Sequence, residues 1–320
     1  MNSATLLLPA RARFGGQRVS ESTARAYGRA DRTRVAGSQL SRVLDILPRG
    51  WPVAAVTRQR DAGDATNAAW LRADPVYVRP ELNGARLLAY GDALPLTRDD
   101  VDAFLPALKP LFGDSGALLD APTPTRWYLR LPPGAKLPRF STPDEALGAD
   151  LFDQLPGVAG DDPLGRCWRA LLSDAQVVLH NHPRNAVRGE RGLPPVNSLW
   201  FWGAGALPDH VTTASTQFAS DDDALRAFAA MANVAHVDLP SRWSSVQGAH
   251  VVDLRHANDI SRIDVDWIAP ALVDIQEGRL ERLVLDFDEG VRAVLTRSQR
   301  WRLWRKPVAQ IGLDTQPATA

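Results

Sequence analysis

The chain has 320 residues, 45% of them hydrophobic, so it is long enough for one large domain or two lobes and too apolar for disorder. Its 37 basic and 37 acidic residues balance, which gives no overall attraction to nucleic acid or membranes. No run approaches the roughly 20 apolar residues of a membrane span, and the N-terminus does not resemble a signal peptide. The single cysteine, Cys167, excludes a disulfide framework, and we expect a cytoplasmic protein.

Charge is spread unevenly along the chain. Residues 1–60 contain eleven arginines and three acidic residues, so this segment carries +8 and the remainder −8. The commoner explanation is two complementary faces of one protein, and the alternative is a lobe that binds anions.

The N-terminal segment predicts two strands and two helices. Thr5–Leu8 is typical of a buried strand, and Ser20–Ala30 predicts a helix that begins at a serine N-cap. Apolar residues at helical spacing predict a second helix over 40–47. The apolar run 52–57 predicts a second buried strand, followed by a polar loop over 58–65.

A hairpin is predicted next. Two runs of strand composition, Val76–Arg79 and Ala85–Tyr90, flank Asn83-Gly84, and an Asn-Gly pair in that position is a strong signal of a tight turn. Arg126–Leu131 predicts a further strand.

A capped helix is predicted between the hairpin and that strand. Thr97 and Asp100 have the spacing of a capping box, and apolar residues continue at helical spacing. Pro106 and Pro110 should bend or shorten this helix. Hairpin, helix and strand together predict a small α+β lobe at roughly 70–135.

The second half of the chain alternates helices and buried strands. Residues 132–163 are rich in proline, glycine and aspartate and predict surface loops. The predicted helices are 164–179, 184–191, 221–233 and 264–276, and the predicted strands are 198–203, 235–239, 250–254, 280–287 and 291–295. This order predicts an α/β fold with a mostly parallel central sheet covered by helices and an inserted smaller α+β lobe. We expect the core to comprise 1–69 and 195–307, the insertion 70–194 and a tail 308–320.

Most sequence signatures of catalysis are missing. The chain has no phosphate-binding G-x-x-x-x-G-K-[ST] loop, no G-x-S-x-G and no H-E-x-x-H. Gly203-Ala204-Gly205 follows a predicted strand without a third glycine, and we interpret it as a plain strand-to-loop turn. Cys167 lies in an apolar helical pattern and is interpreted as a core residue.

Hydrogen-bonding side chains concentrate beside an apolar strand at 174–205. Together with an upstream Arg-x-Asp, they form the candidate anion-binding set Arg72, Asp74, His180, His182, Asn185, Arg188 and Asn197. The donors in this set could bind phosphate or carboxylate oxygens. Arg72 and Asp74 fit an ion pair that closes a turn slightly better than they fit a ligand contact.

Two further patterns have alternative interpretations. Every third position from 250 to 259 carries a possible metal ligand: His250, Asp253, His256 and Asp259. The first three are weak metal candidates, because a strand points them to different faces. Near the C-terminus, a Trp-Arg repeat at 301–305 could stack on bases. We favour a short helix over 298–305 whose tryptophans dock onto the body and whose arginines face water.

The segment H-N-H-P-R-N-A-V-R-G-E-R-G-L-P-P-V-N-S-L-W-F-W-G-A-G resembles archaeal-type cofactor-independent phosphoglycerate mutases. There a His-Pro-x-Asn, an arginine and a glycine precede an apolar strand led by asparagine. The segment is more similar to a bacterial offshoot of that family, the RpfE-type regulatory proteins. The L-L-L-P-A start, W-L-R-A-D-P-V near residue 70 and the late W-R-L-W-R-K-P are similar to that offshoot too.

This resemblance implies the alkaline-phosphatase superfamily, with two divalent metals (Mn or Zn) and a transiently phosphorylated serine. It also implies an Asp-Gly after the first strand and Asp-His ligands late in the chain. Here Pro9-Ala10-Arg11 follows the first strand, Asp253-x-x-His256 has another spacing, and no Asp-His dipeptide occurs. The resemblance therefore implies the scaffold without recognisable metal ligands.

Three functions follow as hypotheses. We prefer a phosphoglycerate-mutase-like protein without cofactor that has lost the two-metal site. It would be a regulatory or small-anion-binding protein, with a small anionic metabolite or a protein as partner. The first alternative is an active phosphoglycerate mutase or phosphatase, with ligands such as His250, Asp253 and His256. The second is a purely structural or interaction protein.

Overall fold

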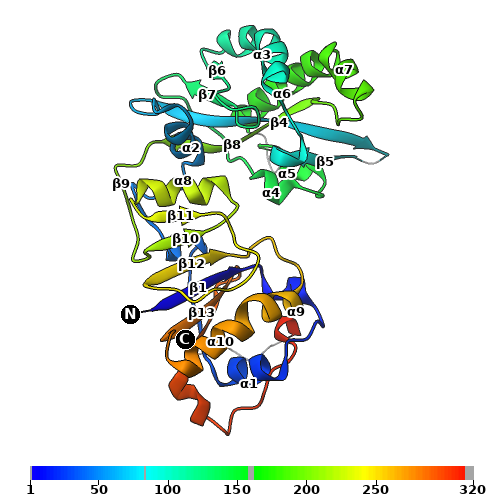
Figure 1. Cartoon of the computed structure of the whole chain (residues 1–320). Helices are drawn as coiled ribbons and strands as arrows, with labels where there is room; N and C mark the ends of the chain where they lie inside the picture. The colour runs from blue at the N-terminus through cyan, green and yellow to red at the C-terminus, as the bar shows by residue number, and fades with distance from the viewer. Residues whose placement is uncertain (1, 83, 158–161, 314–320) are drawn as a thin grey trace. The chain divides into compact units, whose positions relative to one another are not determined.

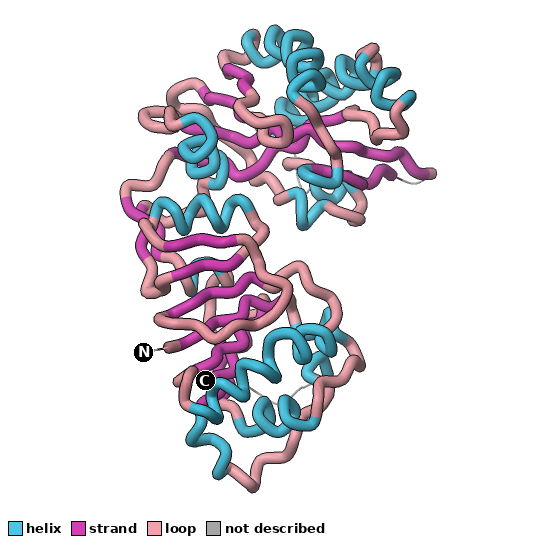
Figure 2. Tube along the Cα trace, in the orientation of Figure 1, coloured by secondary structure: helices cyan, strands magenta, loops and turns pink. Residues whose placement is uncertain are grey.

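The computed structural model describes residues 2–82, 84–157 and 162–313, which form two compact units. The outer unit comprises Met1–Arg49 and Asp209–Ala320, and the inserted unit comprises Gly50–Pro208. Each unit has its own sheet with helices packed against it (Figures 1 and 2). The predicted α/β class, with a separate α+β lobe, is confirmed.

The outer unit is built on a mostly parallel sheet with the strand order β11-β10-β12-β1-β13-β14-β2. The strands are β1 (Ser3–Leu8), β2 (Asp31–Arg34), β10 (Gln217–Ala219), β11 (Ala235–Val237), β12 (Ala249–Asp253), β13 (Arg282–Phe287) and β14 (Val291–Thr296). The first five in the sheet order are parallel, whereas β14 and β2 are antiparallel to their neighbours. The carboxyl ends of β10, β12, β1 and β13 therefore meet at one edge.

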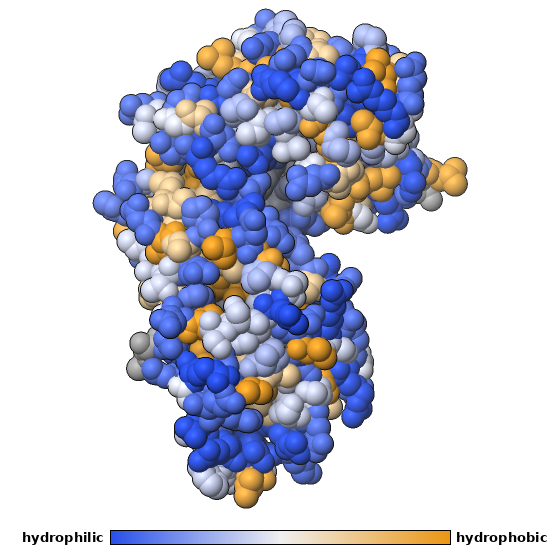
Figure 3. Space-filling model, viewed as in Figure 1, coloured by the Kyte–Doolittle hydropathy of each residue, from blue (hydrophilic) through white to orange (hydrophobic). Residues whose placement is uncertain are grey.

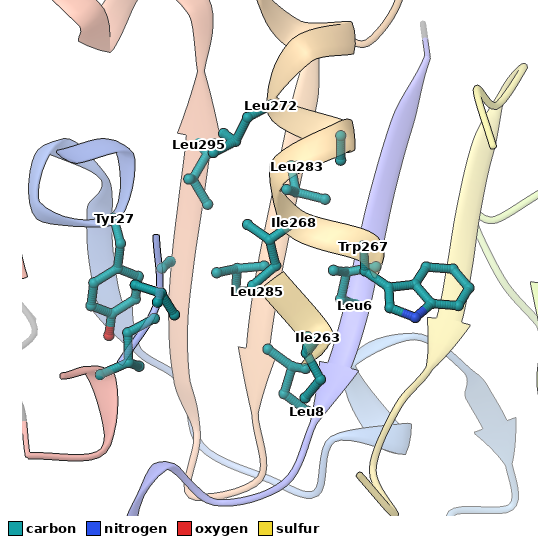
Figure 4. Packing of buried hydrophobic residues seen from close by; sticks show 14 of the residues in the cluster. Leu6, Leu8, Tyr27, Ile263, Trp267, Ile268, Leu272, Leu283, Leu285 and Leu295 are labelled. Carbon is teal, nitrogen blue, oxygen red and sulfur yellow. The ribbon is translucent and has the colours of Figure 1, made fainter. Parts of the chain in front are cut away.

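Helices close the outer core against this sheet. They are α1 (Glu21–Arg29), α8 (Asp223–Met231), α9 (Ile260–Ile263), the π-helical segment η4 (Asp264–Ile268) and α10 (Ala269–Glu277). Figure 4 shows Leu6, Leu285 and Ile268 meeting between the α9–α10 segment and the strands. The predicted N-cap of α1 is confirmed, because the Ser20 side chain accepts a hydrogen bond from the backbone of Thr23.

The inserted unit is organised around β4, which pairs antiparallel with β5, β7 and β8. Its strands are β4 (Ala69–Glu81), β5 (Gly84–Tyr90), β6 (Leu118–Asp120), β7 (Tyr128–Leu131) and β8 (Ser198–Ala206). The predicted hairpin is confirmed as β4–β5, although Asn83 lies outside the described residues. Leu82, which follows β4 at the tip of this hairpin, is an exposed hydrophobic residue, and Figure 3 shows apolar atoms that protrude from the surface.

Helices cover this sheet as well. They are α2 (Val53–Ala62), α3 (Arg98–Gly113), α4 (Pro143–Ala146), α5 (Leu151–Gln154), α6 (Pro163–His180) and α7 (Arg184–Glu190). The capping box of α3 is confirmed, with Thr97 and Asp100 each bonded to the other's backbone N–H. Pro106 and Pro110 lie inside α3 without ending it.

Short 3-10 helices and one small strand pair complete the description. The 3-10 helices are η1 (Arg11–Phe14), η2 (Leu40–Arg42), η3 (Gly91–Ala93), η5 (Arg297–Trp301) and η6 (Ile311–Leu313). In the outer unit, β3 (Asp45–Leu47) pairs antiparallel with β9 (His210–Thr212). Within the described residues, no helix is both long enough and apolar enough to cross a membrane.

Two predictions for the segment 40–65 are wrong. Instead of a helix over 40–47, the chain forms η2 and then β3, because Asp45–Leu47 pairs with a distant strand, β9. Instead of a strand over 52–57 and a loop over 58–65, it forms α2. Val53–Arg58 is buried at every position, so an apolar run without alternation marks a helix covered on all sides.

Three smaller predictions are also corrected. Cys167 is exposed, because Leu172, Ala175 and Leu179 define the buried face of α6 and Cys167 falls away from it. The predicted loops over 132–163 contain α4 and α5. The Trp-Arg repeat at 301–305 begins at the end of η5 and continues without a regular helix. Its tryptophans are exposed and its arginines bind backbone carbonyl oxygens, which is the reverse of the prediction.

The division between units differs from the predicted boundaries at 69/70 and 194/195. It falls at 49/50 and 208/209, because α2 and β8 belong to the inserted unit. β8 pairs with β4 from Ala69 to Val76, so it cannot be part of the outer sheet. The predicted tail 308–320 lies partly outside the described residues, and Ile311 within it is buried.

Candidate functional site

The asparagines of the central stretch bind neighbouring backbone. Asn185 accepts a hydrogen bond from the N–H of Val196 (2.9 Å) and donates to the carbonyl oxygens of Leu179 and Val196 (2.8 Å each). Asn197 accepts from the N–H of Val78 (2.9 Å) and donates to its carbonyl oxygen (2.7 Å). These amides hold the end of α6 and the edge of β4 beside the start of β8.

Arg188 is buried beneath α3. It donates to the carbonyl oxygens of Pro194 (2.9 Å) and Pro95 (3.1 Å) and to Asp100 Oδ2 (2.8 Å). Arg184 binds the other oxygen of Asp100 at 2.7 Å. Burial alone would raise the pKa of Asp100, but hydrogen bonds from the Thr97 backbone and Arg184 and the charge of Arg188 hold it below its usual value.

Arg72 and Asp74 form a buried ion pair on β4, with Nε–Oδ1 and Nη2–Oδ2 distances of 2.8 and 2.7 Å. Trp202 Nε1 donates to the same carboxylate at 2.7 Å. The guanidinium lies 5.1 Å from the Trp202 ring centroid and 5.3 Å from that of Tyr128. The pair is therefore satisfied within the fold.

His180 and His182 have different surroundings. His182 Nδ1 accepts from the backbone N–H of Arg184 (3.2 Å), and its ring packs 4.8 Å from that of Phe104. His180 is exposed and, with Asn197, lines a largely apolar pocket of about 930 Å³. The pocket lining includes neither Arg72 nor His182, Asn185 or Arg188. Ligand binding by the predicted set stays a prediction, and only two of its members share this pocket.

The carboxyl edge of the outer sheet carries a second group of polar residues. Leu7 of β1 is in register with Asp253 of β12 on one side and with Asp286 of β13 on the other. Ser220 and Asp222 follow β10 at the same edge. Ligand sites of parallel sheets are built at this edge, so these residues form the second candidate site.

Asp253 is neutralised by an arginine two residues further on. Arg255 Nε and Nη2 bind its two oxygens at 2.7 Å each, and Nη2 also binds Asp222 at 2.7 Å. Ser220 Oγ donates to Asp253 Oδ2 at 2.7 Å. Burial by itself would raise the pKa of Asp253, but Arg255 and Ser220 hold it below its usual value.

The neighbouring carboxylates have arginine partners too. Arg42 binds both oxygens of Asp286, at 2.6 and 3.1 Å, and Arg292 Nε lies 3.0 Å away. Burial raises the pKa of Asp286 above its usual value, since it outweighs the opposing effect of these arginines. After β1, Arg11 Nε binds Glu289 at 2.6 Å. Asp286 and Glu289, like Asp253, therefore face a guanidinium where a cation could otherwise bind.

A pair of divalent metals does not fit these residues. Among the residues that the structure describes, no three His, Cys, Asp or Glu side chains are grouped to hold a metal. His250 bonds to the Gln247 carbonyl oxygen (2.9 Å) near the start of β12, whereas Asp253 ends that strand. Metals would need carboxylates that the arginines occupy. The candidates His250, Asp253 and His256 are therefore not brought together.

Comparison with curated proteins gives a short match to phosphoglycerate mutases. The chain is 36% identical over 66 residues to a Geobacter sulfurreducens protein named as a probable 2,3-bisphosphoglycerate-independent phosphoglycerate mutase. It is equally identical, over 66 residues, to the enzyme of that name from Methanosarcina barkeri. Each match covers 21% of this chain and only 16% of the relative. No protein-family model matches the chain.

Solved structures give longer but weaker alignments. A cofactor-independent phosphoglycerate mutase from Thermoplasma acidophilum aligns with 92% of this chain and 89% of its own, at 13% identity and a TM-score of 0.42. A Pyrococcus horikoshii protein aligns with 98% and 92%, at 9% identity and a TM-score of 0.47. Sequence similarity to the curated phosphoglycerate mutases is therefore limited to a short segment. The fold of this chain is assigned from its own strand order.

Most of the residues at the sheet edge lie outside the set that the sequence predicts. Asp253 was singled out, but its partners Ser220 and Arg255 were not. Asp286 and Arg42 were also missed. A usable signal exists, because V-V-D and V-L-D-F put a carboxylate at the end of a buried strand, where parallel strands converge.

Proposed function

We propose that this chain is a phosphoglycerate-mutase-like protein that binds a small anion or a regulatory partner and does not carry out metal-dependent phosphoryl transfer. The observation that carries the proposal is the pairing of Asp253 with Arg255 and of Asp286 with Arg42. Both carboxylates lie at the carboxyl edge of the outer sheet, and each is bound by its arginine through both oxygens.

The electrostatics of the edge support this reading. A guanidinium hydrogen-bonded to a buried carboxylate supplies the positive charge that a metal ion would otherwise provide. For a divalent ion to bind Asp253, Arg255 would have to leave both Asp253 and Asp222. The similarity to mutases in a short segment supports a shared origin, and the RpfE-type regulatory role is the finer form of the proposal.

An assay for turnover tests the proposal directly. The purified full chain is supplied with Mn²⁺, Zn²⁺ or Mg²⁺ and with 3-phosphoglycerate, in an assay coupled to the use of 2-phosphoglycerate. We expect no metal-dependent turnover above background, and elemental analysis should find far less than one bound ion per chain. A known mutase in the same assay is the positive control.

The alternative is an active phosphoglycerate mutase or phosphatase, and the same experiment can support it. Saturable turnover that depends on Mn²⁺ or Zn²⁺, with about two ions bound per chain, would sink the proposal. Phosphate release without interconversion would point to the phosphatase.

A further inference from the structure

A small pocket in the outer unit has an arginine rim. It has a volume of about 170 Å³ and lies where α1, α10 and η5 meet. Its floor is apolar, formed by the buried Leu272, Ile275 and Leu295. The four basic residues that line it are Arg25, Arg29, Arg297 and Arg300. None of them belongs to the sheet edge or to the central stretch.

The positive charge of this rim is poorly compensated. Arg25 binds Glu21 at 2.5 Å, but the Glu21 side chain is 79% exposed, so solvent weakens that pair. Within the described residues, Arg29, Arg297 and Arg300 have no carboxylate partner. Guanidinium groups gathered over an apolar floor create a positive potential that attracts anions.

One buried donor of the rim also lacks a partner among the residues that the structure describes. Arg29 Nη1 donates to the Arg300 carbonyl oxygen (3.0 Å), but among the described residues its Nε is buried without a hydrogen-bond partner. The Arg300 guanidinium lies 4.7 Å from the Trp301 ring centroid. Hydroxyl groups of Ser22 and Thr296 add donors to the lining.

We propose that this pocket binds the phosphate group of a small metabolite. Guanidinium forks match the geometry of phosphate oxygens, and hydroxyl donors complete the coordination of a tetrahedral oxyanion. A volume of about 170 Å³ is large enough to hold a phosphate group. This pocket would be the anion-binding site of the protein whose function is proposed above, so the inference rests on that proposal.

Binding of inorganic phosphate to the full chain tests it, by isothermal titration at low salt. The variants R29Q and R297Q should each weaken binding about tenfold, because each removes a charged hydrogen-bond donor. R297K keeps the charge but loses the fork, so it should fall between R297Q and the native chain. R18Q removes an exposed arginine outside the pocket lining and should leave the affinity unchanged. Circular dichroism checks that each variant is folded.

Several results would overturn the inference. Absence of phosphate binding at millimolar concentration would do so, as would equal weakening by R18Q and R297Q. Tighter binding of citrate than of phosphate would show that carboxylates are the ligand class. If binding were unaffected by R29Q and R297Q, the arginine stems would serve only to shield the apolar floor. This experiment measures binding and the earlier one turnover, so the two proposals fail separately.

Discussion

At the scale of residues, arginine side chains supply the positive charge that offsets the buried carboxylates of this protein. Asp253, Asp286 and Asp100 are each buried, and each binds at least one guanidinium. A buried carboxylate without a positive partner is strongly destabilising, so these pairs are needed once the carboxylates are inside. The pairing compensates the charge of each of these carboxylates within the fold.

The substitution D253N should lower the free energy of unfolding by roughly 2–3 kcal/mol at pH 7, because it removes charged hydrogen bonds to Arg255 and Ser220. The pKa of Asp253 is lowered in the folded chain, so its contribution is present above the unfolded value of about 3.9. That contribution is lost as the pH falls through the folded pKa. The gap between native chain and variant should therefore shrink below about pH 4.

Urea denaturation followed by circular dichroism, at neutral pH and at several acidic pH values, measures this gap. D209N is the matched control, since Asp209 is exposed and removing its charge should change little. A gap that stayed constant across the pH range would show that the charge of Asp253 is not what stabilises the fold.

Orientation is the property of single residues that the sequence could not give. The predicted C-terminal arrangement had tryptophans docked and arginines outside, and the reverse is found. Trp301 and Trp304 are 67% and 77% exposed, whereas Arg302 and Arg305 donate to the carbonyl oxygens of Arg29 and Ala30 at the end of α1. Orphan carbonyls at a helix end attract arginine donors, and that attraction outweighed amphipathic patterning here.

At the scale of elements, local signals were sufficient wherever a cap or turn marked the boundary. The capping box of α3, the N-cap of α1 and the β4–β5 hairpin were all predicted from their residues. α2 was not, because a short apolar run looks alike as a buried strand or a buried helix. The adjacent strand β8 explains why a helix fits at this position.

Gly203 and Gly205 lie within β8, where α2 packs directly on the strand. A Cβ on Gly203 would lie 3.0 Å from Val53 Cβ, and a Cβ on Gly205 would lie 2.5 Å from Pro52 Cβ. The two glycines thus allow close approach of helix and strand, whereas the sequence suggested a plain turn. Gly203 also has φ +68, which favours glycine.

The substitution G203A should therefore destabilise the protein by about 2 kcal/mol, through backbone strain and crowding against α2. Thermal or urea denaturation measures the loss. G189A is the control, because nothing lies within 4 Å of a Cβ added there and Gly189 sits in α7, where alanine is favoured by up to about 1 kcal/mol. Equal stability of G203A and the native chain would mean that α2 and β8 can move apart without cost.

At the scale of the whole molecule, the inserted unit is a continuous stretch of chain with its own core. Leu71, Phe104, Leu129, Leu179 and Leu199 belong to one buried cluster inside Gly50–Pro208. The alternation of elements predicted the two-part architecture, but the exact joints depend on which sheet β8 joins. Its strand composition is compatible with either sheet, so only long-range pairing decides.

We expect the fragment 50–208 to fold alone, with a cooperative urea transition and dispersed amide signals in NMR spectra. The fragment 70–194, which follows the boundaries suggested by the sequence, should stay unfolded. It lacks α2 and β8, and β4 would lose its longest partner. Folding of the shorter fragment would show that this unit does not need α2 and β8 to fold.

The small β3–β9 pair bears on how such an architecture can arise. Leu47 is in register with His210, so the chain departs and comes back at adjacent points of the outer unit. The entropy of closing a loop rises with its length, but a prefolded insert whose two ends are fastened together presents only a short gap. If the inserted unit were enlarged or exchanged, the entropy cost of bringing β3 and β9 together would therefore stay nearly the same.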